Sequence, residues 1–224
     1  MQIATLQTIQ TGKPQQLTVP PNMGNSAGLP WETSFFRTPV SQPLWLYKTH
    51  LADNEQADKK NHGQLDQAVL LYAASHYPLW RSEFDLPMIG PGGFGENFTL
   101  EGISEETACL GDIYALGDTR IQVTGPRYPC TKIERRWATP GLTARVAETG
   151  RTGWYCQVLQ EGSVEPGLPL QLIERPYPTW TIALINDLGH GRKHDPAQAQ
   201  AIAACPILVN ELWQNLLTRT VENV

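Results

Sequence analysis

Long hydrophobic runs are absent from this sequence, and so is a leader-like start. No run of apolar residues approaches the ~20 that a membrane-spanning helix needs. Residues 1–5 contain neither the cationic nor the apolar segment of a secretory leader. From these absences we expect a cytoplasmic protein that has no membrane partner.

Positive charge is also scarce. The chain has 17 Lys and Arg residues against 22 Asp and Glu, which gives a formal net charge of -5. Surfaces that bind nucleic acid are usually rich in clustered cations, so we expect no nucleic-acid partner. The sequence also has no internal repeat, no low-complexity tract and no block of like charge.

Cysteine is rare, and its spacing excludes two kinds of site. The four cysteines, Cys109, Cys130, Cys156 and Cys205, lie far apart and form no CxxC pair. Neither a zinc site of that type nor a redox dithiol is therefore indicated. The chain also lacks a flavin, haem or iron–sulfur signature, so any redox reaction would take its electrons from a separate protein.

Short alternating apolar runs are what the first three quarters of the chain does contain. Each is bounded by Gly, Pro, Asn or Asp, which is typical of β-strands. Short strands joined by long loops favour a closed or nearly closed β-barrel, so we expect a mainly β fold with a few short helices. The expected strands are residues 44–47, 67–72, 112–116, 119–123, 153–159 and 170–173, and the expected helices are 76–83 and 143–148.

The pattern changes after residue 176. Apolar residues then recur at spacings of three and four over residues 181–188, 195–204 and 207–218, and Asp195-Pro196 is a favourable helix start. We expect a barrel domain over residues 1–176 and a helical domain over residues 177–224. A unit this small holds little core alone, so it should dock on the barrel or on a second copy in a homodimer.

One cysteine stands in a segment that suits chemistry. Cys130 lies in residues 125–132, GPRYPCTK, directly after an apolar alternation, and the prolines must stop the strand there. Neighbouring Arg127 and Lys132 favour the thiolate, which binds soft metals and electrophiles. The alternative is a small buried side chain in a turn, as most free cysteines are.

Two loops add weaker signals. Residues 89–97 are rich in glycine and end in Glu96 and Asn97, a carboxylate and an amide suited to orienting a substrate or a cofactor. The segment matches neither a phosphate loop nor a dinucleotide fingerprint. Residues 58–63 bring cations and His62 together before a strand. Each segment alone is equally compatible with an ordinary surface loop.

Taken in order, these motifs resemble one family, the MOSC domains of the YiiM type. The resemblance spans nearly the whole chain, and the tail from residue 178 is similar to the three-helix unit that follows the barrel in that subfamily. The segments that carry it are residues 56–58, 62–63, 66–69, 94–99, 101–103, 110–113, 122–123, 126–132 and 149–155.

The resemblance implies a β-barrel that binds the molybdenum cofactor and reduces N-hydroxylated compounds such as hydroxylaminopurine base analogues. By the same resemblance Cys130 is the molybdenum ligand, and Glu96 is the proton donor or an orienting carboxylate. The residues expected to contact the pyranopterin and its phosphate are His62, Asn97, Arg127 and Lys132.

Arg37 occupies a position where relatives usually have Lys. We expect it to act in catalysis through its charge and its paired N–H donors, because a guanidinium does not serve as a base. The loop at residues 62–66 also departs from the family, reading His-Gly-Gln-Leu-Asp where relatives have His-Gly-Gly-Pro-Asp.

A second hypothesis keeps the barrel without the reduction. In it the protein is a sulfur or molybdenum-cofactor carrier, and Cys130 holds a persulfide or delivers the cofactor as a thiolate. A third is a barrel kept as a partner-binding scaffold. The sequence alone does not separate these hypotheses.

Overall fold

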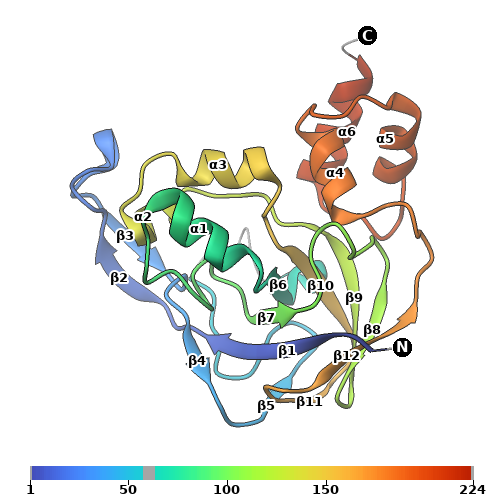
Figure 1. The fold of residues 1–224 in the computed structure, drawn as a ribbon, viewed down its shortest axis with the longest axis horizontal. Coiled ribbons are helices and arrows are strands. Elements are labelled where there is room, and N and C mark those ends of the chain that lie inside the picture. Colours follow the sequence, from blue (N-terminus) through green and yellow to red (C-terminus); the bar gives the residue numbers. More distant parts are fainter. Residues whose placement is uncertain (1, 58–63, 223–224) are drawn as a thin grey trace.

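The computed structural model describes residues 2–57 and 64–222, and the main body of this part is a closed β-barrel (Figure 1). Seven strands pair in the order β12-β8-β9-β10-β6-β7-β1, and the pairing of β1 with β12 closes the ring. β4 pairs with the far end of β1. These strands are β1 (Gln2–Thr11), β4 (Thr38–Val40), β6 (Val69–Ala73), β7 (Phe98–Glu101), β8 (Ile113–Leu116), β9 (Thr119–Pro126), β10 (Trp154–Gln160) and β12 (Pro169–Glu174).

Two small sheets lie beside the barrel. One pairs β2 (Gln15–Thr18) with β3 (Pro30–Thr33), and the other pairs β5 (Leu44–Leu46) with β11 (Gly162–Val164). Short 3₁₀ turns cover Gly24–Ser26 and Leu65–Gln67. Residues 34–37 connect β3 to β4, and β4 pairs with β1. This pairing places residues 34–37 at one end of the barrel.

One strand pair is parallel, and it positions a loop that the site uses. β6 and β7 run side by side in the same direction, which requires a crossover, and α1 (His76–Phe84) with the following glycine-rich loop supplies it. At the end of this crossover the Asn97 N–H donates to the Leu70 carbonyl at 2.9 Å. This hydrogen bond holds the end of the glycine-rich loop against the start of β6.

Two apolar cores explain the near-complete burial of β6. Its inward side chains, including Val69 and Leu71, join the barrel interior around Phe98 and Trp154. Its Tyr72 instead packs outside the barrel against residues of the covering helices. These helices are α1, α2 (Lys132–Trp137) and α3 (Leu142–Thr149). A strand covered on both faces reads as a continuous apolar run, because it has no solvent face.

The C-terminal helices form a third core at one end of the barrel (Figure 1). They are α4 (Ile182–Gly189), α5 (Pro196–Ala203) and α6 (Glu211–Glu222). Leu110 of the barrel joins this core, and the buried Asn186 amide donates to the Gly150 carbonyl and to the Thr152 hydroxyl. These contacts dock the helices on the barrel.

The sequence-based expectation of a mainly β barrel with short helices is confirmed. α1, α3, α4 and α5 lie within a residue or two of the expected ranges, and Asp195 accepts from the Gln198 N–H at 3.0 Å as the cap of α5. The last helix begins later than expected, at Glu211, because Asn210 caps it. The sequence patterns do not predict β1, β2, β3, β4, β7, β11 or α2.

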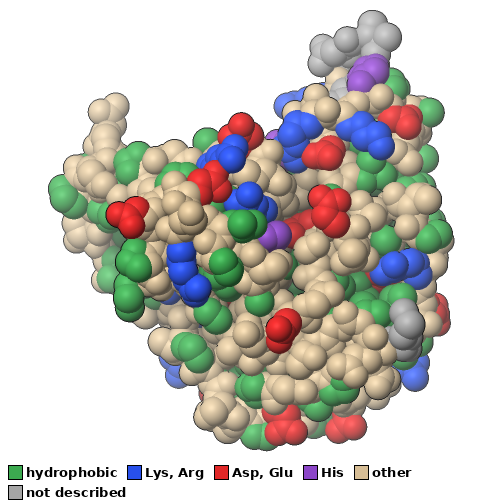
Figure 2. Space-filling model, viewed as in Figure 1, with side chains coloured by type: hydrophobic (Ala, Val, Ile, Leu, Met, Phe, Trp, Pro, Cys, Tyr) green, Lys and Arg blue, Asp and Glu red, His purple; other side chains and the backbone are tan. Residues whose placement is uncertain are grey.

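No helix in the described ranges is long and apolar enough to cross a membrane. On the face shown in Figure 2, cationic and acidic side chains are interspersed, and most of them lie over the helices in the upper half of that view.

Candidate functional site

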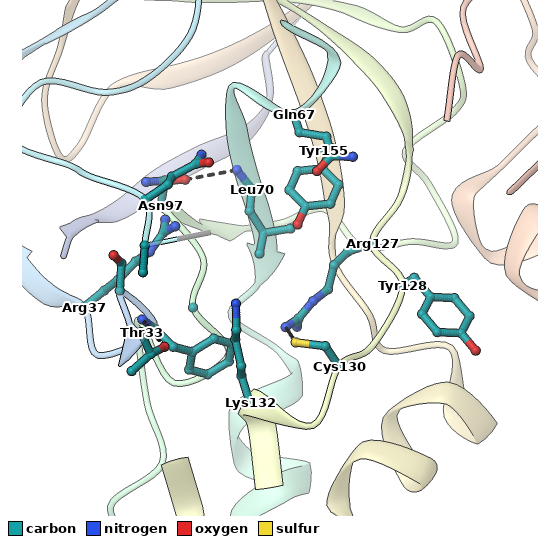
Figure 3. A pocket seen from close by; sticks show the side chains of 15 residues that line it. Thr33, Arg37, Gln67, Leu70, Asn97, Arg127, Tyr128, Cys130, Lys132 and Tyr155 are labelled. Atoms are coloured by element: carbon teal, nitrogen blue, oxygen red, sulfur yellow. Dashed lines mark hydrogen bonds between the residues drawn. The ribbon is translucent and has the colours of Figure 1, made fainter. Parts of the chain in front are cut away.

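A pocket opens at the end of the barrel where β9 stops and α2 begins (Figure 3). Its cavity volume is about 80 Å³, within about 660 Å³ of empty space that includes open solvent. Six chain segments that are separate in sequence meet there. Its lining residues are Thr33, Ser34, Phe35, Arg37, Gln56, Ala57, Gln67, Leu70, Gly95, Asn97, Arg127, Tyr128, Cys130, Lys132 and Tyr155.

Cys130 is the only cysteine that the pocket exposes. Its side chain is partly accessible, whereas Cys109, Cys156 and Cys205 are buried. The Pro129–Cys130 step leaves the strand and enters α2, whose first turn closes when the Ile133 N–H donates to the Cys130 carbonyl at 3.1 Å. The Thr143 hydroxyl of α3 donates to the same carbonyl at 3.2 Å. Two helices therefore fix the backbone that carries the thiol.

Arg127 lies beside this thiol and is almost fully buried, with 3% exposure. Its Nη2 is 3.8 Å from the Cys130 Sγ, and its guanidinium sits over the Phe35 ring, 5.7 Å from the centroid. Its Nη1 is buried and has no hydrogen-bond partner among the residues that the structure describes. A buried guanidinium N–H without an acceptor is costly, so this atom is placed to meet an acceptor on a ligand.

The backbone of Arg127 is linked through Gly153 to the buried pair Glu105 and His76, which sequence reasoning missed. The Arg127 N–H donates to the Gly153 carbonyl at 3.0 Å, and the Gly153 N–H donates to Glu105 Oε1 at 2.7 Å. Glu105 in turn contacts His76 at 2.6 Å. These residues share no local motif with Cys130, so only the fold reveals their connection.

Arg37 faces the same pocket from the segment after β3. Its Nε and Nη1 are buried and have no hydrogen-bond partner within residues 2–57 and 64–222. Burial lowers the pKa of Arg37 to about 10, which still leaves the guanidinium protonated at neutral pH. The pocket thus has a second buried cation with unused donors.

Asn97 supplies a neutral donor between these cations and β6. Its Oδ1 accepts from the Leu70 N–H at 3.2 Å (Figure 3), which fixes the orientation of the amide. Its Nδ2 has no hydrogen-bond partner among the described residues, although the residue is only 2% exposed and lines the pocket. An unsatisfied buried amide of this kind indicates a position for a ligand acceptor.

Glu96 does not line the pocket. The side chain has 0% exposure. Its carboxylate accepts from the hydroxyls of Tyr77 and Thr99 and from the N–H groups of Gly92 and Phe94. These four hydrogen bonds hold the glycine-rich loop in shape, and the role of Glu96 as proton donor or orienting carboxylate stays a prediction.

That loop needs glycine where it borders the pocket. Gly95 has φ +74°, and a Cβ there would lie 2.8 Å from the Phe35 ring. Glycine adopts this conformation without strain, so the loop approaches Phe35 closely enough to wall the pocket. This is a structural reason for the glycine cluster, in place of an anion-binding loop.

Lys132 and Tyr155 complete the wall near the thiol (Figure 3). Both side chains are partly buried. Burial raises the pKa of Tyr155, so its hydroxyl keeps its proton at neutral pH. The lining has three cationic side chains, Arg37, Arg127 and Lys132, and no carboxylate. The described part of the site therefore favours an anionic ligand.

His62 lies outside the described residues, so its predicted contact has no structural description. Sequence reasoning did not single out Tyr155, Gln56 or Gln67 as lining residues. Tyr155 lies on β10, where its alternation with the core residues Trp154 and Cys156 signals only an outward-facing position.

The described residues contain no cluster of three or more His, Cys, Asp or Glu side chains that suits a metal ion. A metal at this pocket would therefore have one protein thiolate and would need its other ligands from a bound organic group.

Comparisons with known proteins place this site in a family. The MOSC domain family matches residues 58–171, half of the chain. This chain belongs to the MOSC family. It superposes on the crystal structure of YiiM from Geobacillus stearothermophilus with a TM-score of 0.78 at 32% identity, covering 97% of this chain and 99% of that one. The chain is a MOSC protein of the YiiM type.

Two further relatives differ in how much of their own length the match covers. The uncharacterized protein YflK of Bacillus subtilis (strain 168) is 34% identical over 195 residues, which is 87% of this chain and 83% of that protein. A protein named Reductase from Gibberella moniliformis is 38% identical over 143 residues, which is 62% of this MOSC protein. The match spans only 25% of that reductase.

Proposed function

We propose that this MOSC protein binds the molybdenum cofactor in the Cys130 pocket and reduces N-hydroxylated compounds. The single observation that carries the proposal is the set of unused buried donors around a partly exposed thiol. Arg37, Arg127 and Asn97 line the pocket and have buried N–H groups with no partner among the described residues, and none of the described lining residues is a carboxylate.

The donor set fits that cofactor. The pyranopterin bears a phosphate and ring acceptors, which guanidinium and amide N–H groups bind. Arg37, Arg127 and Asn97 would hold these groups, and Lys132 would add a charge near the rim. Molybdenum favours soft sulfur ligands, and Cys130 supplies one where the dithiolene of the cofactor supplies the others.

The reaction takes two electrons and two protons: R–NH–OH + 2e⁻ + 2H⁺ gives R–NH₂ + H₂O. When bound, the cofactor would supply the two-electron redox chemistry. The protein orients the substrate and provides protons, and the side chains that carry a transferable proton beside Cys130 are Lys132 and Tyr155. A separate redox protein supplies the electrons.

The test is turnover by protein expressed in a host that makes the cofactor, with reduced methyl viologen as the electron source. Wild type and the matched control Cys205→Ser, whose cysteine lies outside the pocket, should convert 6-N-hydroxylaminopurine to adenine. Cys130→Ser should not. Molybdenum-loaded wild type that leaves the substrate unchanged would overturn the reductase proposal and favour the carrier hypothesis.

A further inference from the structure

A second hollow continues outward from the Cys130 pocket. Its cavity volume is about 620 Å³, and it runs from Cys130 to the first residues of α6. It shares five lining residues with the inner pocket, namely Gln67, Tyr128, Cys130, Lys132 and Tyr155. We call this hollow the outer groove. The thiol therefore stands where the inner pocket and the outer groove meet.

The two hollows differ in chemistry. The unused N–H donors of Arg37 and Asn97 belong to the inner pocket alone. The outer groove instead has three large apolar side chains that remain well exposed: Tyr128 at 45%, Val209 at 52% and Leu212 at 45%. Figure 3 shows Tyr128 on the far side of Cys130 from Arg37 and Asn97.

The apolar wall is a rigid one. Tyr128 stacks on His190 with a centroid separation of 5.8 Å and contacts the edge of the buried Trp213 at 6.1 Å. Asn210 accepts from the Trp213 N–H and so fixes the start of α6. Leu212 occupies the second position of that helix. The barrel and the C-terminal helices thus present a fixed apolar surface beside the thiol.

The polar lining of the outer groove includes three amides, Gln64, Gln67 and Asn210, which pair with both donors and acceptors. It also includes the charged side chains of Lys132, Arg135 and Glu211. Sites for small organic molecules combine apolar side chains with polar groups that orient the ligand, and they have volumes of about 300–1,000 Å³. The outer groove is large enough for a ring without any movement of the backbone.

We propose that the outer groove binds the flat ring of an N-hydroxylated substrate, and that Leu212 and Val209 of the C-terminal helical unit determine the preference for ring-bearing substrates. The inference rests on the proposed function for its reactive end, which lies at Cys130. The helical unit then contributes to specificity, although the MOSC family match ends at residue 171.

The test compares two hydroxamic acids that share the reactive group. Benzhydroxamic acid bears a ring and acetohydroxamic acid bears a methyl group. In Leu212→Ser the KM for the ring compound should rise about tenfold, and the KM for the methyl compound should stay within about twofold. Leu79→Ser is the matched control, because Leu79 has 46% exposure on α1 and does not line the outer groove.

A binding measurement separates this inference from the reductase proposal. Benzamide, the unreactive product, is titrated into the cofactor-free protein by calorimetry. Wild type and Leu79→Ser should bind it equally, and Leu212→Trp, which fills the outer groove, should bind about tenfold more weakly. Equal binding by all three proteins, or none by wild type, overturns the inference even if the loaded enzyme is active. A Leu212 variant that weakens only the electron donor's KM also overturns it, and makes the outer groove a donor-docking surface.

Discussion

The Arg127 Nη2 lies 3.8 Å from the Cys130 Sγ, and its Nη1 has no partner in the described part of the chain. One guanidinium therefore contacts the thiol and keeps an unused donor at the pocket lining. We expect Arg127→Met to retain about tenfold less molybdenum than wild type, since a lost charge-assisted contact beside a metal site has this order of effect. Elemental analysis of purified protein measures it. Arg120→Met, an exposed site on β9, is the control, and equal loading of all three proteins would contradict the role of Arg127.

The role of Asn97 in cofactor binding can be tested with a variant that removes its side-chain N–H donors and keeps the oxygen that accepts from the Leu70 N–H. In Asn97→Asp the Leu70 N–H still finds an oxygen, so the thermal midpoint should hold or rise because a carboxylate now faces the pocket cations. Cofactor retention should fall, since the donor is lost and a negative charge opposes the phosphate. Asn215→Asp on the exposed face of α6 controls for the added charge. Retained cofactor in Asn97→Asp would show that the free Nδ2 contacts nothing.

Glu96 is expected to affect folding more than chemistry. Glu96→Gln replaces a carboxylate oxygen by an NH₂ group that faces an N–H or hydroxyl donor, which should lower the free energy of unfolding by about 2–3 kcal/mol. Urea denaturation measures this against Glu101→Gln, an exposed site at the end of β7. If Glu96→Gln is as stable as wild type and loses turnover alone, Glu96 is the proton donor that the sequence suggested.

Arg37 is expected to destabilise the cofactor-free protein and to contribute to cofactor binding. Burial lowers its pKa to about 10, so the folded protein holds a desolvated charge at neutral pH. Arg37→Met is expected to raise the free energy of unfolding of the cofactor-free protein by about 1 kcal/mol, and to reduce cofactor loading. The stability gain over wild type should shrink as the pH rises through about 10, because the buried charge is lost there. A variant less stable than wild type at pH 7 would show that Arg37 is paired in the free protein.

The sequence predicted the barrel because strand alternation and turn residues are local signals. It also predicted Cys130, Arg127 and Lys132 together, since they lie within six residues of one another. The sequence did not predict the contacts that depend on the parallel pairing of β6 with β7. Glu96 is the best example. It is adjacent to Asn97 in sequence, but its carboxylate accepts hydrogen bonds from four donors outside the pocket lining.

Residues far from the motif were missed for the same reason. Tyr155 and Leu212 come to the thiol only when β10 pairs with β9 and the C-terminal helices dock. Their own sequence neighbourhoods signal a strand and a helix start, and neither carries a chemical motif.

The central claim is that Cys130 ligates molybdenum in this pocket, and metal content tests it most directly. Wild type, Cys130→Ala and the control Cys205→Ala are expressed in a host that makes the cofactor and analysed by mass spectrometry for molybdenum. The account predicts near-stoichiometric metal in wild type and Cys205→Ala, and its loss in Cys130→Ala. Absence of molybdenum from all three proteins, with cofactor synthesis by the host confirmed, would contradict it.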